Sequence, residues 1–299
     1  MDEVFVIGEP ETLVAPAVSD WRRFLKILFQ RKLVVVGTFV LVCLVLVAIF
    51  APLIAPYDPV KIDMGHTLQS SSGTHLLGTD NLGRDVFSRL VYGSRTALIV
   101  GLGTVAFSAV IGIILGILAG FLGGWINAVI MRIMDALMGF PMMVLALLLA
   151  AVMGAGMKNI IIALGIATLP GYTRLMCAAT LSVRENEYIL AQRAIGAKSL
   201  RTMVRHVLPN AIQPMIVLIT TMLGNIVLAE AGLSFLGIGV NPSTTAAWGS
   251  MAVGGFRFLG EHPLLSFAPC IAIAVVVFAF NMLGDGLRDA LDPRLRGKL

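Results

Sequence analysis

Four cations, Arg193, Lys198, Arg201 and Arg205, crowd into the short stretch 187–210, EYILAQRAIGAKSLRTMVRHVLPN. This stretch lies between two apolar runs that are each long enough to cross a membrane. Charged side chains are costly inside lipid, so the stretch must face water. We therefore expect it to bind a partner in the water.

The side chains that could act in catalysis form no recognisable group. The sequence lacks the phosphate-binding pattern GxxxxGK[ST], the zinc pattern HExxH and the nucleophile pattern GxSxG. Its four histidines are scattered, and its three cysteines lie in apolar runs without metal-ligand spacing. We predict no catalytic residue, no metal site and no cofactor bound by this chain, so that any driving chemistry comes from a partner.

Polar residues inside apolar runs are candidates for a translocation path, because ionisable groups at membrane depth are costly and tend to be functional. They are Asp135, Asn225 and Glu230. The alternative for Asp135 is a structural pair with Arg132, one turn earlier on the same helix. Arg174, in another apolar run, is then expected to extend toward the lipid headgroups.

Composition places the chain among membrane proteins. Of its 299 residues, 58% are hydrophobic and 13% are charged, and the mean hydropathy is +0.91. A soluble domain carries about 25% charged residues. A net charge of +5 is also found in proteins that bind nucleic acid, but here the basic residues cluster beside apolar runs. We therefore expect contact with lipid and no nucleic-acid partner.

Six apolar segments are long enough to span a hydrocarbon core of about 30 Å. They are residues 33–55, 97–121, 134–154, 159–181, 211–231 and 266–287. Gly123 and Gly124 predict the turn that separates the second segment from the third. The first segment is too long for the apolar region of a signal peptide, so it is expected to stay as an anchor. The fold class predicted is an all-α polytopic membrane protein with six transmembrane helices.

The distribution of basic residues predicts the orientation of these spans. Lys and Arg gather before the first span, after the last span and in the loop between the fourth and fifth. By the positive-inside rule, both termini and this loop are cytoplasmic. The predicted regions are a cytoplasmic tail 1–32, a first span 33–55, an extracytoplasmic segment 56–96, a core 97–287 containing the cytoplasmic loop 182–210, and a cytoplasmic tail 288–299.

The end of the N-terminal tail, SDWRRFLKILFQRK (19–32), has apolar residues at the spacing of one helix face and cations on the other. This pattern predicts a helix that lies flat among the lipid headgroups. The alternative is a simple continuation of the first span.

The stretch 187–210 reads as two short helices. Apolar residues in its second half recur at the spacing of one helix face, and Pro209 is expected to end that helix. They are Leu200, Met203, Val204, Val207 and Leu208. Gly196 separates this helix from an earlier one near 187–195, at the point where a chain reverses most easily. The pattern predicts a protruding knuckle whose apolar stripe packs toward the membrane domain; the alternative is a solvated loop.

Gly112, Gly116 and Gly120 repeat the small-xxx-small spacing that lets helices approach closely. This favours a packed bundle, or a paired subunit, over isolated helices.

The stretch 187–210 resembles the EAA loop of binding-protein-dependent ABC importer permeases, whose pattern is E-A-A-x3-G-x9-I-x-L-P. Four residues match at the required spacing: Ala191, Gly196, Leu208 and Pro209. Other residues replace the glutamate, the second alanine and the isoleucine.

Further segments resemble the dipeptide/oligopeptide/nickel permease family and together cover most of the chain from Gly78 onward. They are GTDNLGRDVFSRLVYGSRTAL (78–98), MRIMDALMGFP (131–141), LSFLGIG (233–239) and NMLGDGLRDALDPRLR (281–296).

The resemblance implies the type I ABC importer permease fold in the inner (plasma) membrane of a bacterium or archaeon. It implies a heterodimer with a second permease subunit, two ATP-binding subunits that hold ATP and Mg, and an extracytoplasmic protein that delivers small peptides. The implied contacts with an ATPase subunit are Ala191, Arg193, Ala194, Gly196, Ala197, Lys198 and Ser199.

In the same light, Asp80, Arg84, Asp85 and Arg89 have spacings of four and five residues, suited to ion pairs that fold an extracytoplasmic lip. The alternative is direct contact with the binding protein or the cargo.

Several alternatives remain open at this point. The same architecture carries nickel chelates, glutathione or opines in related systems. A secondary transporter driven by an ion gradient would prefer inverted repeats and intramembrane carboxylates. A membrane-embedded hydrolase would need paired catalytic groups.

Overall fold

The computed structural model describes residues 28–291, apart from the side chain of Arg193. Within those residues the chain is helix and loop, without a β-strand; one isolated bridge joins Thr79 to Asp85. The predicted all-α class is confirmed. Most of the predicted headgroup helix (19–32) lies outside the described residues, as does the end of the C-terminal tail.

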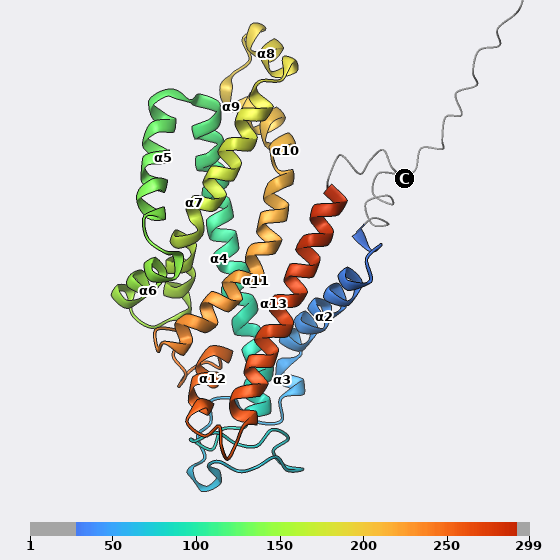
Figure 1. Cartoon of the computed structure of the whole chain (residues 1–299), viewed down its shortest axis with the longest axis vertical. Coiled ribbons are helices and arrows are strands. Elements are labelled where there is room, and N and C mark those ends of the chain that lie inside the picture. The colour runs from blue at the N-terminus through green and yellow to red at the C-terminus, as the bar shows by residue number, and fades with distance from the viewer. Residues whose placement is uncertain (1–27, 292–299) are drawn as a thin grey trace, which may run out of the picture.

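Five helices of the described part are long and apolar enough to cross a membrane (Figure 1). They are α2 (Lys32–Ile49), α4 (Val86–Leu122), α7 (Met157–Arg184), α11 (Gln213–Phe235) and α13 (Leu264–Leu291). A sixth crossing results if α5 (Gly124–Met138) and α6 (Met142–Met153) count as one span.

The predicted third span is therefore not one continuous helix. α5 and α6 are bent by 89° at a break that contains Gly139 and Pro141. Proline has no N–H for the helix ladder, and it disfavours helical geometry in the residue before it. By contrast, the turn predicted at Gly123 and Gly124 is present, and both residues have a positive φ.

The shorter elements lie near the two ends of the bundle, and α3, which continues α2, lies on the same side as α12 (Figure 1). They are α3 (Ala51–Ile54), η1 (Met64–His66), α8 (Glu187–Ala194), α9 (Ser199–Thr202), the π-helical turn η2 (Met203–Val207), α10 (Leu208–Ala211) and α12 (Trp248–Phe256). We call the two ends the α8 end and the α12 end.

The glycine stripe of α4 packs against α7. A Cβ on Gly112 would lie 2.5 Å from Cβ of Tyr172, and a Cβ on Gly116 would lie 2.6 Å from Cβ of Met176. Non-bonded carbon atoms do not approach this closely, so only glycine allows the two helices to lie at this distance. The stripe predicted from sequence therefore serves packing within the chain.

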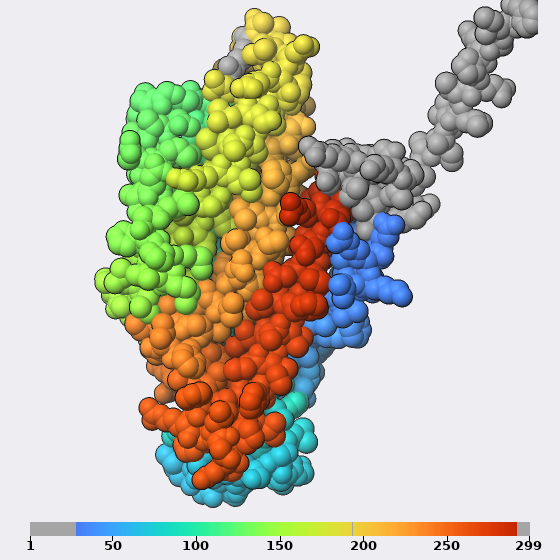
Figure 2. All heavy atoms as spheres, in the orientation of Figure 1, coloured from blue at the N-terminus to red at the C-terminus, as the bar shows by residue number. Residues whose placement is uncertain are grey.

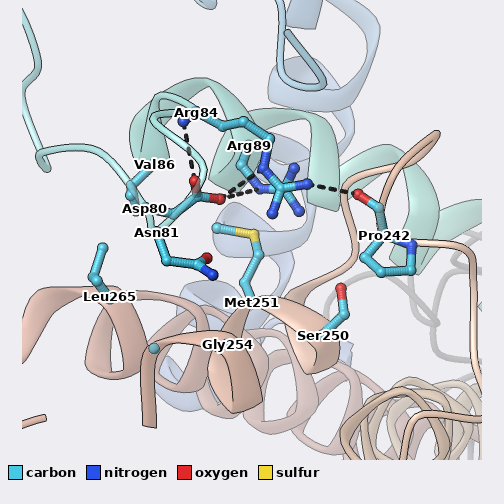
Figure 3. Close-up of a pocket in the computed structure, with 11 residues that line it drawn as sticks. Asp80, Asn81, Arg84, Val86, Arg89, Pro242, Ser250, Met251, Gly254 and Leu265 are labelled. Carbon is cyan, nitrogen blue, oxygen red and sulfur yellow. Dashed lines mark hydrogen bonds and ion pairs between the residues drawn. The ribbon is translucent and has the colours of Figure 1, made fainter. Parts of the chain in front are cut away.

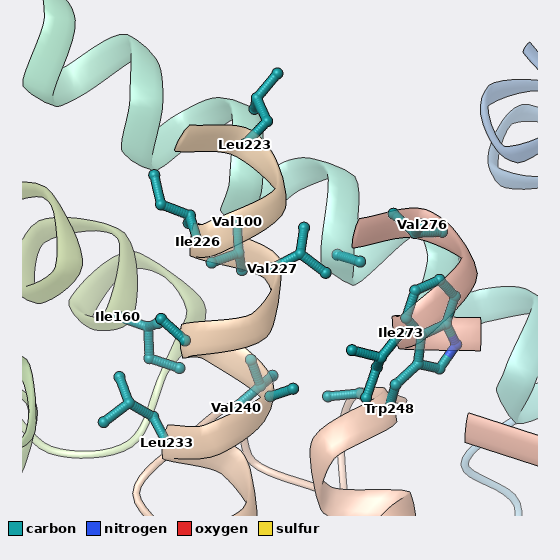
Figure 4. Packing of buried hydrophobic residues seen from close by; sticks show 14 of the residues in the cluster. Val100, Ile160, Leu223, Ile226, Val227, Leu233, Val240, Trp248, Ile273 and Val276 are labelled. Carbon is teal, nitrogen blue, oxygen red and sulfur yellow. The ribbon is translucent and has the colours of Figure 1, made fainter. Parts of the chain in front are cut away.

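Two apolar clusters hold the bundle together. The larger joins α2, α4, α7, α11, α12 and α13, and includes Val100, Ile226 and Ile273 (Figure 4). Trp248 lies in this cluster and donates from Nε1 to the carbonyl oxygen of Leu90 at 2.9 Å, which fixes α12 to α4. The second cluster joins the α8 end to α4, α7 and α11.

α2 lies alongside α13 (Figure 2). Polar contacts fix α2 near both of its ends. Nε of Arg95 donates to the carbonyl oxygen of Ala48 at 2.6 Å, where a cation suits the C-terminal end of a helix. At the other end, Arg31 forms an ion pair with Asp289 at 2.9 Å. Much of the apolar surface of α2 is exposed, as expected for a helix that contacts lipid.

Candidate functional site

The knuckle predicted at 187–210 is present at the α8 end, where α8 projects beyond α5 and α10 (Figure 1, Figure 2). α8 ends in a reversal at Gly196, whose φ is 76°. The amide nitrogen of Ala197 donates to the carbonyl oxygen of Gln192 at 3.0 Å, the six-to-one bond of a Schellman motif. Nothing lies within 4 Å of the position that a Cβ on Gly196 would take, so the need for glycine is conformational.

The second half of the knuckle is less regular than predicted. The amide of Leu208 donates to the carbonyl oxygen of Met203, five residues back, so the turn before Pro209 is π-helical. Pro209 cannot donate to this ladder and begins the short helix α10. The predicted apolar stripe is split: Met203 and Val207 are buried, whereas Leu200 and Val204 are exposed.

One side chain anchors the knuckle to the bundle. Ile189 of α8 is fully buried in the second apolar cluster, together with Tyr172 and Met176 of α7 and Met215 of α11. A displacement of α8 would therefore be transmitted directly to two spans.

The outer surface of the knuckle combines exposed apolar groups with cations. Leu190 is 51% exposed and Ile195 is 77% exposed. Within residues 28–291, Lys198, Arg201 and Arg205 form no ion pair. Of the predicted ATPase contacts, Ala191, Ala194, Gly196, Lys198 and Ser199 are exposed and Ala197 is half-buried, and the side chain of Arg193 is outside the description.

Asp135 does not pair with Arg132, contrary to the structural alternative drawn from spacing. Its carboxylate forms an ion pair with the guanidinium of Arg174, so α5 is joined to α7. Arg174 therefore does not extend away toward the headgroups. Both side chains remain 45% exposed.

The other two candidates for the path differ in exposure. Asn225 of α11 is exposed. Glu230, on the same helix, is 2% exposed and accepts a hydrogen bond from Oγ of Ser234 at 2.8 Å. A role in the path stays a prediction for both, and Glu230 would have to leave this packing to reach cargo.

The predicted lip is built at the α12 end around Asp80 (Figure 3). Nε of Arg84 donates to Oδ2 of Asp80 at 2.7 Å, and Nη1 of Arg84 donates to the carbonyl oxygen of Pro242 at 2.9 Å. Nε of Arg89 lies 3.7 Å from the same carboxylate, and its Nη1 donates to the carbonyl oxygen of Pro59 at 2.9 Å. These contacts join three segments that are distant in the sequence: the loop at Pro59, residues 80–89 and the loop at Pro242.

Asp85 has a different role from the pairing with Arg89 that its spacing suggests. Its Oδ2 accepts from the amide of Ser88 at 2.7 Å and caps the first turn of α4. Its Oδ1 lies 2.9 Å from Nδ1 of His75, whose ring stacks on Tyr57. Nearby, a hydrogen bond from His66 lowers the pKa of Asp63 below its ordinary value.

Metal ligation is not indicated in the described part of the chain. No group of three or more His, Cys, Asp or Glu side chains converges there in a way that could hold an ion.

Comparisons with known proteins agree with this architecture. Residues 112–297 match the family described as binding-protein-dependent transport system inner membrane component. Residues 19–70 match the N-terminal transmembrane domain of oligopeptide transport permease C.

Two curated relatives align over nearly their whole length. The dipeptide transport system permease protein DppC of Alkalihalophilus pseudofirmus is 40% identical over 280 residues, which cover 94% of this chain and 92% of the relative. The glutathione transport system permease protein GsiD of Escherichia coli is 39% identical over 290 residues, which cover 97% and 94%.

A solved structure with the same fold is the MetNI methionine ABC transporter in an inward-facing conformation. The similarity has a TM-score of 0.57 and 21% sequence identity, and covers 69% of this chain and 97% of that chain.

Proposed function

The chain belongs to the family of binding-protein-dependent inner membrane components of ABC importers, and from this premise we propose that it is the permease subunit of an importer for small peptides. It is a multi-pass inner-membrane protein. ATP would be hydrolysed by partner subunits, which would also hold the Mg, and a second permease subunit would complete the path.

The observation that carries the proposal is the exposed knuckle at Gly196. Apolar groups such as Leu190 and Ile195 project into water beside three cations that form no ion pair within residues 28–291. An exposed apolar patch beside charge is typical of a protein–protein contact. A groove with acidic edges on an ATP-binding subunit would complement it. The α8 end would then be cytoplasmic.

The buried anchor gives a physical route for coupling. When the ATP-binding subunits close, they would push on α8, and Ile189 would pass that displacement to α7 and α11 through the second apolar cluster. Packed helices move as rigid bodies between discrete arrangements, as alternating access requires. The break between α5 and α6 and the exposed polar groups Asp135 and Asn225 would lie along the path.

The cargo proposed is a small peptide, in keeping with the name of the dipeptide permease relative. Glutathione is supported almost equally by the GsiD relatives, and a nickel chelate or an opine remains an alternative within the same architecture. A secondary transporter driven by an ion gradient is the alternative from another class, and family membership argues against it.

The test is reconstitution of this chain with its second permease subunit, the ATP-binding subunits and the binding protein in proteoliposomes. We expect uptake of a labelled dipeptide that requires both ATP and the binding protein. Uptake that persists without ATP and follows an imposed ion gradient would overturn the proposal.

A further inference from the structure

The ion pair between Asp135 and Arg174 joins α5 to the middle part of α7, well away from both ends of α7. Arg174 is ten residues before Arg184, the last residue of α7, which is about 15 Å at 1.5 Å per residue. Asp135 is eleven residues after Gly124, the first residue of α5, which is about 16 Å. Both helices have these ends at the α8 end (Figure 1). α7 has 28 residues, about 42 Å, so it is longer than a hydrocarbon core of about 30 Å. A core centred on α7 places the pair within about 5 Å of the midplane, because Arg174 is three to four residues from the middle of that helix.

The side chains of Asp135 and Arg174 are each 45% exposed, and exposing an ion pair to lipid at this depth would be energetically costly. Ionisable side chains inside membranes almost always face a bundle interior or a water-filled cavity. The exposed face at the α5–α7 seam is therefore not a lipid face. It faces water or the second permease subunit.

The chain is also broken at this level. The 89° bend between α5 and α6 begins a few residues after Asp135, at Gly139 and Pro141. Interrupted helices near the midplane occur where the backbone lines a cavity, because in lipid the freed N–H and C=O groups would have no partner. This observation is independent of the ion pair and points to the same aqueous space.

The pair has bonding capacity to spare. Arg174 carries five N–H donors, and among the described residues its side chain donates only to Asp135, through one of its nitrogens. The Asp135 carboxylate likewise accepts no other hydrogen bond from residues 28–291. If the pair were a purely structural bridge in a water-free contact between helices, the remaining N–H donors of Arg174 and acceptor sites of Asp135 would lack partners, at a cost in free energy.

We propose that Asp135 and Arg174 form a paired-charge station in the translocation path, at which a zwitterionic solute exchanges its own charges with those of the pair. The cationic end of the solute would lie against Asp135 and its carboxylate against Arg174, so the net charge of the site does not change. This deepens the peptide-importer proposal and rests on it, since a free peptide carries an ammonium and a carboxylate group. A bare metal cation carries no carboxylate, so its binding to Asp135 would leave the guanidinium of Arg174 without a counter-charge.

The first experiment asks whether both charges face the same water. Cysteine is placed at Ala128, seven residues before Asp135 on the same face of α5, in a variant whose Cys43, Cys177 and Cys270 are alanine. The assembled complex in lipid nanodiscs is treated with a cationic and an anionic methanethiosulfonate of similar size. The matched control is Ile133→Cys, which is also exposed but lies about 160° around the helix from Asp135.

We expect Ala128→Cys to react and Ile133→Cys to react at least tenfold more slowly, because the latter faces lipid. Adding Asp135→Asn should shift the ratio of rates at least threefold toward the anionic reagent, and adding Arg174→Gln should shift it equally toward the cationic reagent. A ratio that neither substitution changes would overturn the station, as would equal labelling at the two cysteines. These rates are measured without cargo, so they stand whatever cargo the complex carries.

The second experiment tests the exchange itself. The double variant Asp135→Asn with Arg174→Gln keeps two amide side chains that can hydrogen bond but removes both charges. We expect dipeptide uptake to fall at least tenfold while stimulation of ATP hydrolysis by the binding protein changes less than twofold. Unchanged uptake would overturn the station. Loss of both activities together with loss of assembly would show a structural bridge and overturn it as well. Absence of ATP-dependent uptake in the unsubstituted complex would instead count against the peptide-importer proposal.

Discussion

The amide nitrogen of Ala197 lies 3.0 Å from the carbonyl oxygen of Gln192, and this hydrogen bond closes the reversal at the exposed tip of the bundle. Gly196 takes the left-handed conformation between them, with φ of 76°. The angle between α8 and the helices that follow is therefore set by one backbone conformation, and the surface offered to a partner depends on it.

Replacing Gly196 with valine should uncouple ATP hydrolysis from uptake while membrane insertion is kept. The cost in free energy is about 1–2 kcal/mol, because a branched side chain is strained at positive φ. The matched control is Gly124→Val, where φ is 53° and nothing lies within 4 Å of the added Cβ. Binding-protein-stimulated ATP hydrolysis and uptake should be measured in parallel. Equal loss of uptake in both variants would count against a special role for the knuckle.

Ile189 and Leu190 are neighbours with opposite burial, so they separate anchoring from docking. Ile189→Ala should destabilise the α8 end by about 2–4 kcal/mol, since its side chain is fully buried. Leu190→Ala should leave stability within about 0.5 kcal/mol but weaken binding of the ATP-binding subunits. Hydrogen exchange of 187–210 reports the first effect and pull-down of the ATP-binding subunits reports the second. The reverse assignment would contradict the structure.

The glycine stripe makes a prediction about the stability of the α4–α7 pair. Gly116→Ala places a methyl group 2.6 Å from Cβ of Met176 and should cost about 1–3 kcal/mol as the helices are forced apart. Gly171→Ala in α7 meets nothing within 4 Å and should be neutral or slightly stabilising, because alanine favours a helix more than glycine does. Thermal unfolding of the purified protein distinguishes them; a lower midpoint for Gly171→Ala would be the wrong sign.

Asp80 is the one carboxylate within reach of two nearly buried guanidinium groups, Arg84 and Arg89, in the part of the chain that the structure describes. Asp80→Asn should destabilise the lip by about 3–5 kcal/mol, because the cations lose their counter-charge. Lys61→Gln removes an exposed charge from the same segment and should change stability by less than about 0.5 kcal/mol. Protease sensitivity of residues 56–85 provides the measurement, and equal sensitivity of the two variants would refute the prediction.

The sequence predicts the spans well because the thickness of the bilayer sets the length of an apolar run. It predicts Gly196 and the turn at Gly123 and Gly124 because those backbones need glycine. It misplaces the start of α4 by eleven residues: the predicted span begins at residue 97, whereas the helix begins at Val86. The first turns of α4 bury polar groups such as Ser88 and Arg89 against the lip, so hydropathy does not reveal them.

Tertiary partners lie beyond what spacing can predict. Asp135 has a cation one turn away in Arg132, yet it pairs with Arg174 on another helix, because the rotation of each helix about its axis decides which side chains meet. The only hint in the sequence is that Asp135 and Arg174 are single opposite charges in separate apolar runs. For the same reason, Asp85 caps α4 and contacts His75 instead of pairing with Arg89.

The most direct test of the account is photo-crosslinking in the assembled importer from the two ends of this subunit. A benzophenone amino acid is placed at Ala194, exposed on the knuckle, or at Asn81, exposed on the lip. We predict that Ala194 crosslinks to an ATP-binding subunit and that Asn81 crosslinks to the extracytoplasmic binding protein. Crosslinks from Ala194 to the binding protein, or from Asn81 to an ATP-binding subunit, would contradict both the orientation of the bundle and the coupling role of the knuckle.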